Sequence, residues 1–186
     1  MNRKFMSDTA RAMDQQEIQK LIQQGKLPDA LRALDGLDAD DRNSQMNLYM
    51  RGVCLRHLRQ WADAEKVLHQ LIAKSPSYGR GFQELGHLYR DAGRPPEAVG
   101  AYATACHLNP ALKASWQGQY NLLDHERSVD RVAQVKERID WLDGLPPVLL
   151  ASLDMLHELA AQLLRLDQLA FVQHIEAGQK HGRQAV

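Results

Sequence analysis

Three residue types recur in this sequence at a constant spacing of 34 residues. The recurring pairs are Gly52 and Gly86, Ala64 and Ala98, and Pro76 and Pro110. A fixed period of about 20 to 50 residues is the signature of stacked supersecondary units, which bury their apolar faces against one another. The spacing therefore predicts an array of repeats, and it constrains the fold more than any other feature of the chain.

The clearest copy of the repeat reads FQELGHLYRDAGRPPEAVGAYATACHLNP and divides into two helices joined by a short turn. Gly86 on the first helix and Ala98 on the second are small, as required where the two helices of a hairpin approach closely. We expect Gly93 to end the first helix in a left-handed conformation. Pro95 or Pro96 is expected to begin the second helix, where a missing N–H costs nothing.

This copy resembles the tetratricopeptide (TPR) pattern, in which aromatic, leucine, glycine and alanine residues hold fixed places in a helix pair. Phe82 stands where tryptophan is usual, and Tyr102 stands where phenylalanine is usual. The other matching residues are Leu85, Gly86, Tyr89, Ala98 and Ala105. The resemblance implies an all-α fold, a TPR-like α-solenoid of antiparallel helix pairs with about ten helices and a C-terminal helical cap.

We divide the chain into TPR-like repeats over residues 1–143 and a C-terminal helical capping segment over residues 144–186. The four copies are expected at about residues 10–43, 45–78, 79–112 and 113–143. The second copy has Arg59 in place of the turn glycine, and the fourth has Val132 in place of the small residue on its second helix. We therefore expect the last helix pair to be more open, or packed differently.

The capping segment opens with GLPP at residues 144–147, which predicts a loop followed by a proline at a helix start. Apolar residues then recur at helical spacing along a predicted helix over residues 147–166. They are Leu149, Leu153, Leu156, Leu159 or Ala160, and Leu163. Because a long apolar stripe needs cover, we expect either a neighbouring repeat or a second copy of the chain, in a homodimer through the C-terminal helices, to pack on it.

The charge balance argues against two large classes of partner. Lys+Arg and Asp+Glu both number 23, so the formal net charge is +0 and the pI is about 7.1. No net field attracts such a chain to nucleic acid or to an anionic membrane. No stretch has the apolar length of a secretory signal or a membrane span. We predict a cytoplasmic, reducing location in which Cys54 and Cys106 are small buried thiols.

Motifs that would indicate catalysis or metal binding are incomplete. His157 and Glu158 begin an HExxH zinc motif, but Ala161 takes the place of the second histidine. The acidic run at residues 38–41 lacks the glycine and the bidentate glutamate of a calcium loop, so a solvated loop between repeats is predicted. No GxGxxG, GxSxG or phosphate-binding loop occurs. The chain is therefore predicted not to be an enzyme, with no catalytic residue, metal site or cofactor.

The first helices of successive repeats line the concave surface of a solenoid, where their outward-facing side chains form a groove. We take the register from Gly52, Gly86 and Tyr120. The predicted groove residues are Gln19, Tyr49, Val53, Arg56, His57, Arg80, Gln83, His87, Arg90, Gln117 and Asn121. Their three arginines give the groove a local basic character that fits an acidic or phosphorylated peptide. Alternatively, these arginines are only solvated.

The favoured function is a non-catalytic protein–protein interaction scaffold or adaptor that binds a peptide or protein segment in this groove. A second reading comes from about residues 113–158, which resemble the N-terminal repeat region of bacterial TPR-containing sulfotransferases. That resemblance implies a repeat module of a larger enzyme, although no segment matches the loop that grips the sulfuryl donor. A secretion-type chaperone is a further alternative, but such chaperones tend to be acidic and this chain is neutral.

Overall fold

The computed structural model describes residues 15–125 and 127–160, and within these ranges the chain forms helices and no strand. The elements are helical residues 15–23, α2 Leu27–Asp35, α3 Ala39–Arg42, α4 Gln45–His57, α5 Trp61–Lys74, α6 Gly79–Asp91, α7 Pro95–Leu108, α8 Lys113–Leu122, α9 Val129–Asp143 and helical residues 147–160. The predicted all-α class is confirmed. The expected start of the first copy at residue 10 and the end of the capping segment lie outside the described residues.

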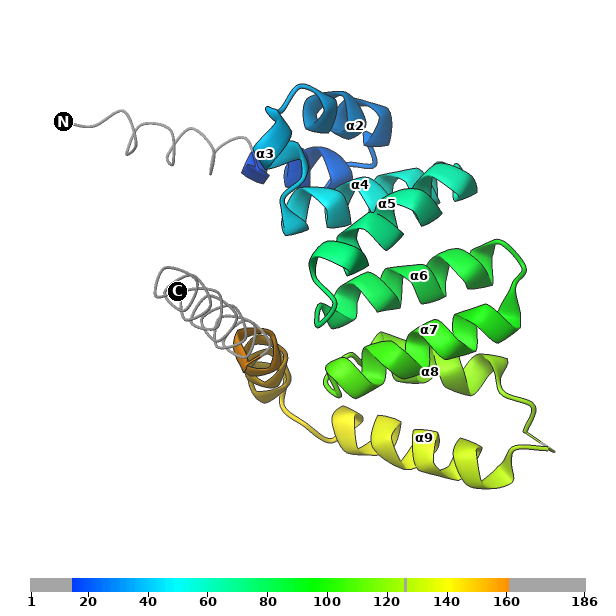
Figure 1. Ribbon diagram of the computed structural model, residues 1–186. Coiled ribbons are helices and arrows are strands. Elements are labelled where there is room, and N and C mark those ends of the chain that lie inside the picture. Colours follow the sequence, from blue (N-terminus) through cyan, green and yellow to red (C-terminus); the bar gives the residue numbers. More distant parts are fainter. Residues whose placement is uncertain (1–14, 126, 161–186) are drawn as a thin grey trace, which may run out of the picture.

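The helices stack as antiparallel pairs. Figure 1 shows α4 to α7 layered one on another, with α8 behind α7 and α9 below it. The first helices of the pairs begin at Gln45, Gly79 and Lys113, so they follow one another at the 34-residue period of the sequence. Each pair packs on the next, as in a solenoid. The predicted α-solenoid of antiparallel helix pairs is confirmed.

Two large side chains fill the spaces that glycines leave between helices. A Cβ atom on Gly52 would lie 2.5 Å from the Leu68 side chain, well inside the normal carbon–carbon contact distance. A Cβ atom on Gly86 of α6 or on Gly118 of α8 would lie 2.5 Å from the Tyr102 ring. Tyr102 therefore packs α6, α7 and α8 together. The prediction that Gly86 lies at a close helix approach is confirmed.

Three turns, spaced 34 residues apart, each contain a residue in the left-handed region. Gly25 and Gly93 have a φ of +72°, and for Gly93 this confirms the prediction. Arg59 occupies the same place in the second copy with a φ of 58°, although it carries a side chain. This conformation costs a non-glycine residue roughly 1–2 kcal/mol. The turn after α4 is therefore strained, and the packing of α4 on α5 holds it in place.

The prolines at the helix starts are where the sequence predicted them, but one predicted loop is a helix. Prolines lie in the first turn of α2 and of α7, as predicted for Pro95 and Pro96. The predicted solvated loop at residues 38–41 is wrong, because this run forms the one-turn helix α3. Asp38 caps it by accepting a hydrogen bond from the backbone N–H of Asp41 at 2.9 Å. Carboxylates in the first turn of a helix are stabilised by its dipole, which explains the helix.

The apolar core runs through the stack as two adjoining clusters. The larger contains Leu48, Leu55, Leu68, Leu71, Leu85, Leu88 and Tyr102, and the smaller contains Ile18, Ala30, Leu34, Met50 and Cys54. Leu31 and Tyr49 pack against both clusters. Ala64 and Ala98 are fully buried at the crossings of their pairs, whereas Val132 is only partly buried. Cys54 and Cys106 are buried free thiols, as predicted.

Helical residues 147–160 lie beside the ends of the helix pairs and do not continue the stack (Figure 1). Asp154 accepts hydrogen bonds from Arg80 at the start of α6 and from Asn109 after α7, the latter at 2.7 Å. One carboxylate therefore ties the capping segment to two places on the solenoid. Within the described part of the chain, no helix has both the length and the apolar character needed to cross a membrane.

Candidate binding groove

A pocket of about 320 Å³ opens between helical residues 15–23, α4 and α6. Its lining residues are Gln19, Ile22, Gln23, Met46, Tyr49, Met50, Val53, Arg56, His57 and Glu84. The predicted groove residues Gln19, Tyr49, Val53, Arg56 and His57 are thus brought together here. The lining mixes apolar side chains with amide and charged groups. Such a mixture suits a site that takes up an apolar side chain and orients it by hydrogen bonds.

Arg56 forms ion pairs with two carboxylates, Glu84 in the lining of this pocket and Asp91. Its Nε donates to Oε2 of Glu84 at 2.9 Å, and its Nη1 donates to Oδ2 of Asp91 at 2.9 Å. The side chains of Arg56 and Glu84 are only 10% and 6% exposed. Burial disfavours the charged guanidinium, but the adjacent carboxylates outweigh this effect and raise the pKa of Arg56. Arg56 therefore stays charged and joins α4 to α6.

Asp91 is shared between two arginines. Nε and Nη2 of Arg90 donate to its Oδ1 at 3.0 and 2.8 Å, in addition to the bond from Arg56. Burial acts to raise the pKa of Asp91, but the hydrogen bonds from Arg90 and Arg56 outweigh it and hold the pKa below its ordinary value. Two of the three predicted groove arginines are therefore neutralised by carboxylates of α6.

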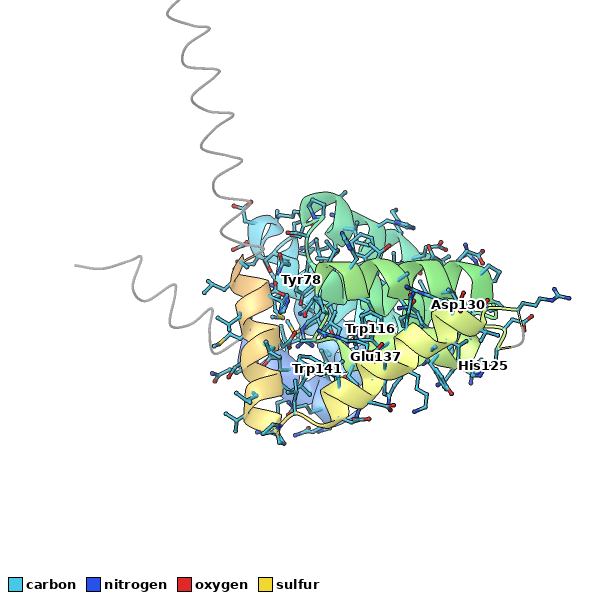
Figure 2. All side chains as sticks on the ribbon, turned by 90° about the horizontal axis from the view of Figure 1, so that it is seen from below. Tyr78, Trp116, His125, Asp130, Glu137 and Trp141 are labelled. Atoms are coloured by element: carbon cyan, nitrogen blue, oxygen red, sulfur yellow. The ribbon has the colours of Figure 1, made fainter. Side chains whose placement is uncertain are left out.

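Arg80 is paired with Asp154 of the capping segment. It borders a second cavity, of about 430 Å³, between the starts of α4 and α6 and helical residues 147–160. Figure 2 shows Tyr78 next to this helix, and its ring meets the Tyr49 ring edge-on with centroids 5.8 Å apart. Met46 lines both cavities, so the groove continues from the first into the second.

The two tyrosines between these cavities stay protonated at neutral pH. Burial raises the pKa of Tyr49 to about 12 and also raises the pKa of Tyr78. Their hydroxyl groups therefore keep a proton that they can donate to a ligand. Among the described residues, no group of three or more His, Cys, Asp or Glu side chains is placed to hold a metal ion.

Gln83 and His87 lie at the junction of α6, α7 and α8. Nδ1 of His87 lies 2.6 Å from the hydroxyl oxygen of Tyr102, and Oε1 of Gln83 accepts a hydrogen bond from Ser115 at 3.3 Å. Burial lowers the pKa of His87, and the carboxylate of Glu84 only partly opposes this effect. These two predicted groove residues line neither cavity of the groove.

The structure separates the remaining predicted residues from the pocket. Gln117 and Asn121 are exposed on α8 and line neither cavity, while Arg90 contacts Asp91 at the end of α6. Because all three predicted arginines pair with carboxylates, the local basic character expected of the groove is largely cancelled. The acidic ligand stays a prediction.

The carboxylates of the groove, Glu84 and Asp154, were not among the residues predicted from the sequence. Glu84 lies 34 residues after Met50, which also lines the pocket, so the repeat register contained a signal for it. Asp154 lies outside the repeats, and no period of the sequence relates it to Arg80. Its position in the groove follows only from the way the capping segment packs on the solenoid.

No family model matches the sequence, and no curated protein matches it either. The fold matches solved structures of MamA. One, described as MamA RS-1 ArsTM double mutant, gives a TM-score of 0.61 at 20% identity over 72% of this chain and 75% of that chain. Another, described as Crystal structure of MamA, gives a TM-score of 0.63 at 17% identity over 72% of this chain and 78% of that chain.

These neighbours are TPR-like all-α solenoids. At this level of identity the likeness concerns the fold alone. None of the comparisons bears on the resemblance of residues 113–158 to sulfotransferase repeat regions, which stays a prediction. The 34-residue period, the helix pairs and the structural neighbours agree, and the chain has the fold of a TPR-like α-solenoid.

Proposed function

We propose that this chain is a protein-interaction scaffold or adaptor that binds a peptide or protein segment in the groove between helical residues 15–23, α4 and α6. The observation that carries the proposal is the pocket of about 320 Å³ in which Gln19, Tyr49 and Val53 lie together. One large side chain of an extended segment fits such a cavity. The rest of the segment then follows the first helices toward the second cavity, which Met46 connects to the first.

The lining favours an apolar or aromatic anchor on the bound segment. Val53 contributes a branched apolar side chain, and Met46 contributes a flexible one that adapts to different ligand shapes. Tyr49 adds a partly buried ring with a hydroxyl donor. A buried anchor of this kind commonly supplies most of the binding energy of an interface. The amides of Gln19 and Gln23 provide donors and acceptors for the backbone of the segment.

In this proposal the arginines organise the groove and do not receive the ligand. Arg56 is already hydrogen-bonded to Glu84 and Asp91, so an acidic ligand competes with two carboxylates in place. A segment with a neutral anchor avoids that competition. The acidic peptide predicted from the sequence is therefore the less favoured ligand.

The test is a pull-down from native lysate with three baits, followed by mass spectrometry. The baits are the wild-type chain, Val53→Arg and the control Ala62→Arg. Val53→Arg places a long charged side chain in the pocket, whereas Ala62 is exposed on α5 and lines neither cavity of the groove. We expect a partner that the wild-type and control chains retain and Val53→Arg loses. Identical recovery on all three baits would reject the groove.

A second copy of the chain is our proposed partner for the exposed face of helical residues 147–160. Five large apolar side chains on it are between 50% and 76% exposed, namely Val148, Leu149, Met155, Leu156 and Leu159. Their spacing puts them along one side of a helix, and two such faces related by a two-fold axis cover each other. Light scattering tests this. A dimer that Leu156→Glu dissociates supports the proposal, and a monomeric wild-type chain contradicts it.

A further inference from the structure

Another cavity, of about 490 Å³, lies between α7, α8 and α9 and shares no lining residue with the groove. Ala103 and Pro110 give it apolar walls, and Trp116 gives it an aromatic one. Cys106 and His107 of α7 and Arg131 and Arg138 of α9 complete the lining. Figure 2 views the molecule from the side of α9 and shows Trp116 alongside that helix. The cavity therefore combines apolar surface with two cationic groups.

The two arginines have no carboxylate partner in the described part of the chain. They are seven residues apart, so they lie on the same side of α9. Asp130 and Glu137, labelled in Figure 2, are their neighbours in sequence, yet no ion pair joins either of them to Arg131 or Arg138. Most other described arginines pair with Asp or Glu. Neither arginine of this cavity is therefore paired with a carboxylate among the described residues.

A hydrogen bond to a buried side chain holds Arg131 in position. Its Nη2 donates to Oε1 of Gln119 at 2.8 Å, and Nε2 of Gln119 donates to Sγ of Cys106 at 3.2 Å. Gln119 is fully buried, so water does not compete for its hydrogen bonds. It fixes the guanidinium while its other N–H groups stay available to a ligand.

Arg138 is positioned by an aromatic ring. Its guanidinium carbon lies 4.1 Å from the centroid of the Trp141 ring, in a cation–π contact. Its Nε is shielded from solvent and has no hydrogen-bond partner. Because solvent does not reach Nε, a ligand oxygen contacts this guanidinium through its Nη1 and Nη2 groups, neither of which is hydrogen-bonded to another described residue. The cavity is therefore prepared for a ligand that brings oxygen atoms.

We propose that this cavity binds an oxyanion, either a phosphoryl or a carboxylate group, carried on an apolar or aromatic moiety. Two guanidinium groups offer planar sets of donors that match the oxygens of such anions. Trp116 already donates its indole N–H to the carbonyl of Pro110 at 3.0 Å, so it presents its ring to the ligand. The oxyanion contacts the arginines of α9, and the carrier packs on Trp116 and Ala103.

The nearby cysteine does not make this a reactive site. Burial raises the pKa of the Cys106 thiol to about 12. The thiol is therefore protonated at neutral pH and is not a nucleophile. The cavity binds its ligand without covalent chemistry.

The indole N–H signals of the three tryptophans test the proposal by NMR in the intact chain. Phenyl phosphate and benzoate serve as probes, because they share an aromatic carrier and differ in the anion. Each is titrated at constant ionic strength. We expect saturable shifts of the Trp116 and Trp141 signals with at least one probe. The probe that binds more tightly shows whether the cavity prefers a phosphoryl or a carboxylate group. Trp61, at the start of α5, is the internal control and should not move.

Variants assign the effect to the arginines. We expect Arg131→Gln/Arg138→Gln to weaken binding by about tenfold or more. The single variant Arg138→Gln, which leaves the Arg131–Gln119 bond intact, should weaken it less. Arg127→Gln removes one exposed positive charge nearby and should bind as the wild type does. Absence of saturation with both probes, unchanged binding by the double variant, or a shift of Trp61 alone would each overturn the proposal.

Discussion

Arg56 of α4 and Glu84 of α6 form an ion pair with 2.9 Å between Nε and Oε2, although 28 residues separate them in the sequence. Both side chains are nearly buried. They come from the first helices of two successive repeats, so the pair fixes how those helices sit relative to each other. Because both also line the pocket of the groove, the shape of the binding site and the stability of the stack depend on the same contact.

Glu84→Ala should therefore destabilise the fold markedly. It leaves the buried guanidinium of Arg56 with Asp91 as its remaining carboxylate. Breaking a buried pair from one side costs roughly 3 kcal/mol, the low end of the usual range, because this second partner persists. Urea unfolding of Glu84→Ala, Arg56→Ala and the double variant measures the coupling. Additive losses in free energy of unfolding would contradict the account.

The strained turn after α4 offers a stabilising substitution. Arg59→Gly removes the left-handed strain, and this gain exceeds the added entropy of the unfolded chain, so we expect about 0.5–1 kcal/mol of stabilisation. Gly93→Arg makes the reverse change in the next repeat, where φ is +72°, and should destabilise by a similar amount. Thermal unfolding compares the two. A lower melting temperature for Arg59→Gly would show that the turn is not strained.

Two glycine-to-alanine substitutions should change the stability of the chain in opposite directions. Gly86→Ala forces a methyl group against the Tyr102 ring and should cost roughly 1–3 kcal/mol. Gly100→Ala, in the middle of α7, meets nothing within 4 Å and should stabilise the chain by up to about 1 kcal/mol through helix propensity. Chemical denaturation of the two variants checks this. Equal effects would mean that Tyr102 does not fill the space beside Gly86.

The repeat period predicted most of the fold, because helix pairs recur with the same local packing. From it came the helix pairs, the glycine at the close approach to Tyr102 and the left-handed turn at Gly93. Tyr49 and Val53, which it assigned to one surface, line the same pocket. Such features depend on contacts within a repeat or on its register, and both are visible in the spacing of residues.

The remaining features depend on contacts between repeats and beyond them. The partners of Arg56 lie 28 and 35 residues away in the sequence. A small displacement of α6 relative to α4 would give Arg56 different partners. The contact of Arg80 with Asp154 spans 74 residues and joins the solenoid to a segment without the repeat. The period specifies how helices alternate, but the pairing of long side chains follows from the final positions of those helices. For this reason the basic groove expected from the sequence is largely neutral in the structure.

His87 should make the stability of the chain depend on pH. Burial lowers its pKa in the folded chain, whereas the unfolded chain has the ordinary value of 6.5. The unfolded state therefore binds the proton more readily, and stability present above about pH 6.5 is lost as the pH falls below it. We expect the free energy of unfolding to decrease between about pH 7 and 5.5, and to decrease less in His87→Gln. Parallel pH profiles for the two chains would exclude His87 as the source.

Photo-crosslinking from residue 53 shows whether a protein segment binds in the groove of α4. A benzoylphenylalanine replaces Val53 in one chain and Ala62 in a control chain, and adducts formed in native lysate are identified by mass spectrometry. We expect residue 53 to capture the same partner repeatedly, excess wild-type chain to suppress this adduct, and residue 62 not to form it. The same adducts from both positions, or none from residue 53, would exclude this groove as the binding site.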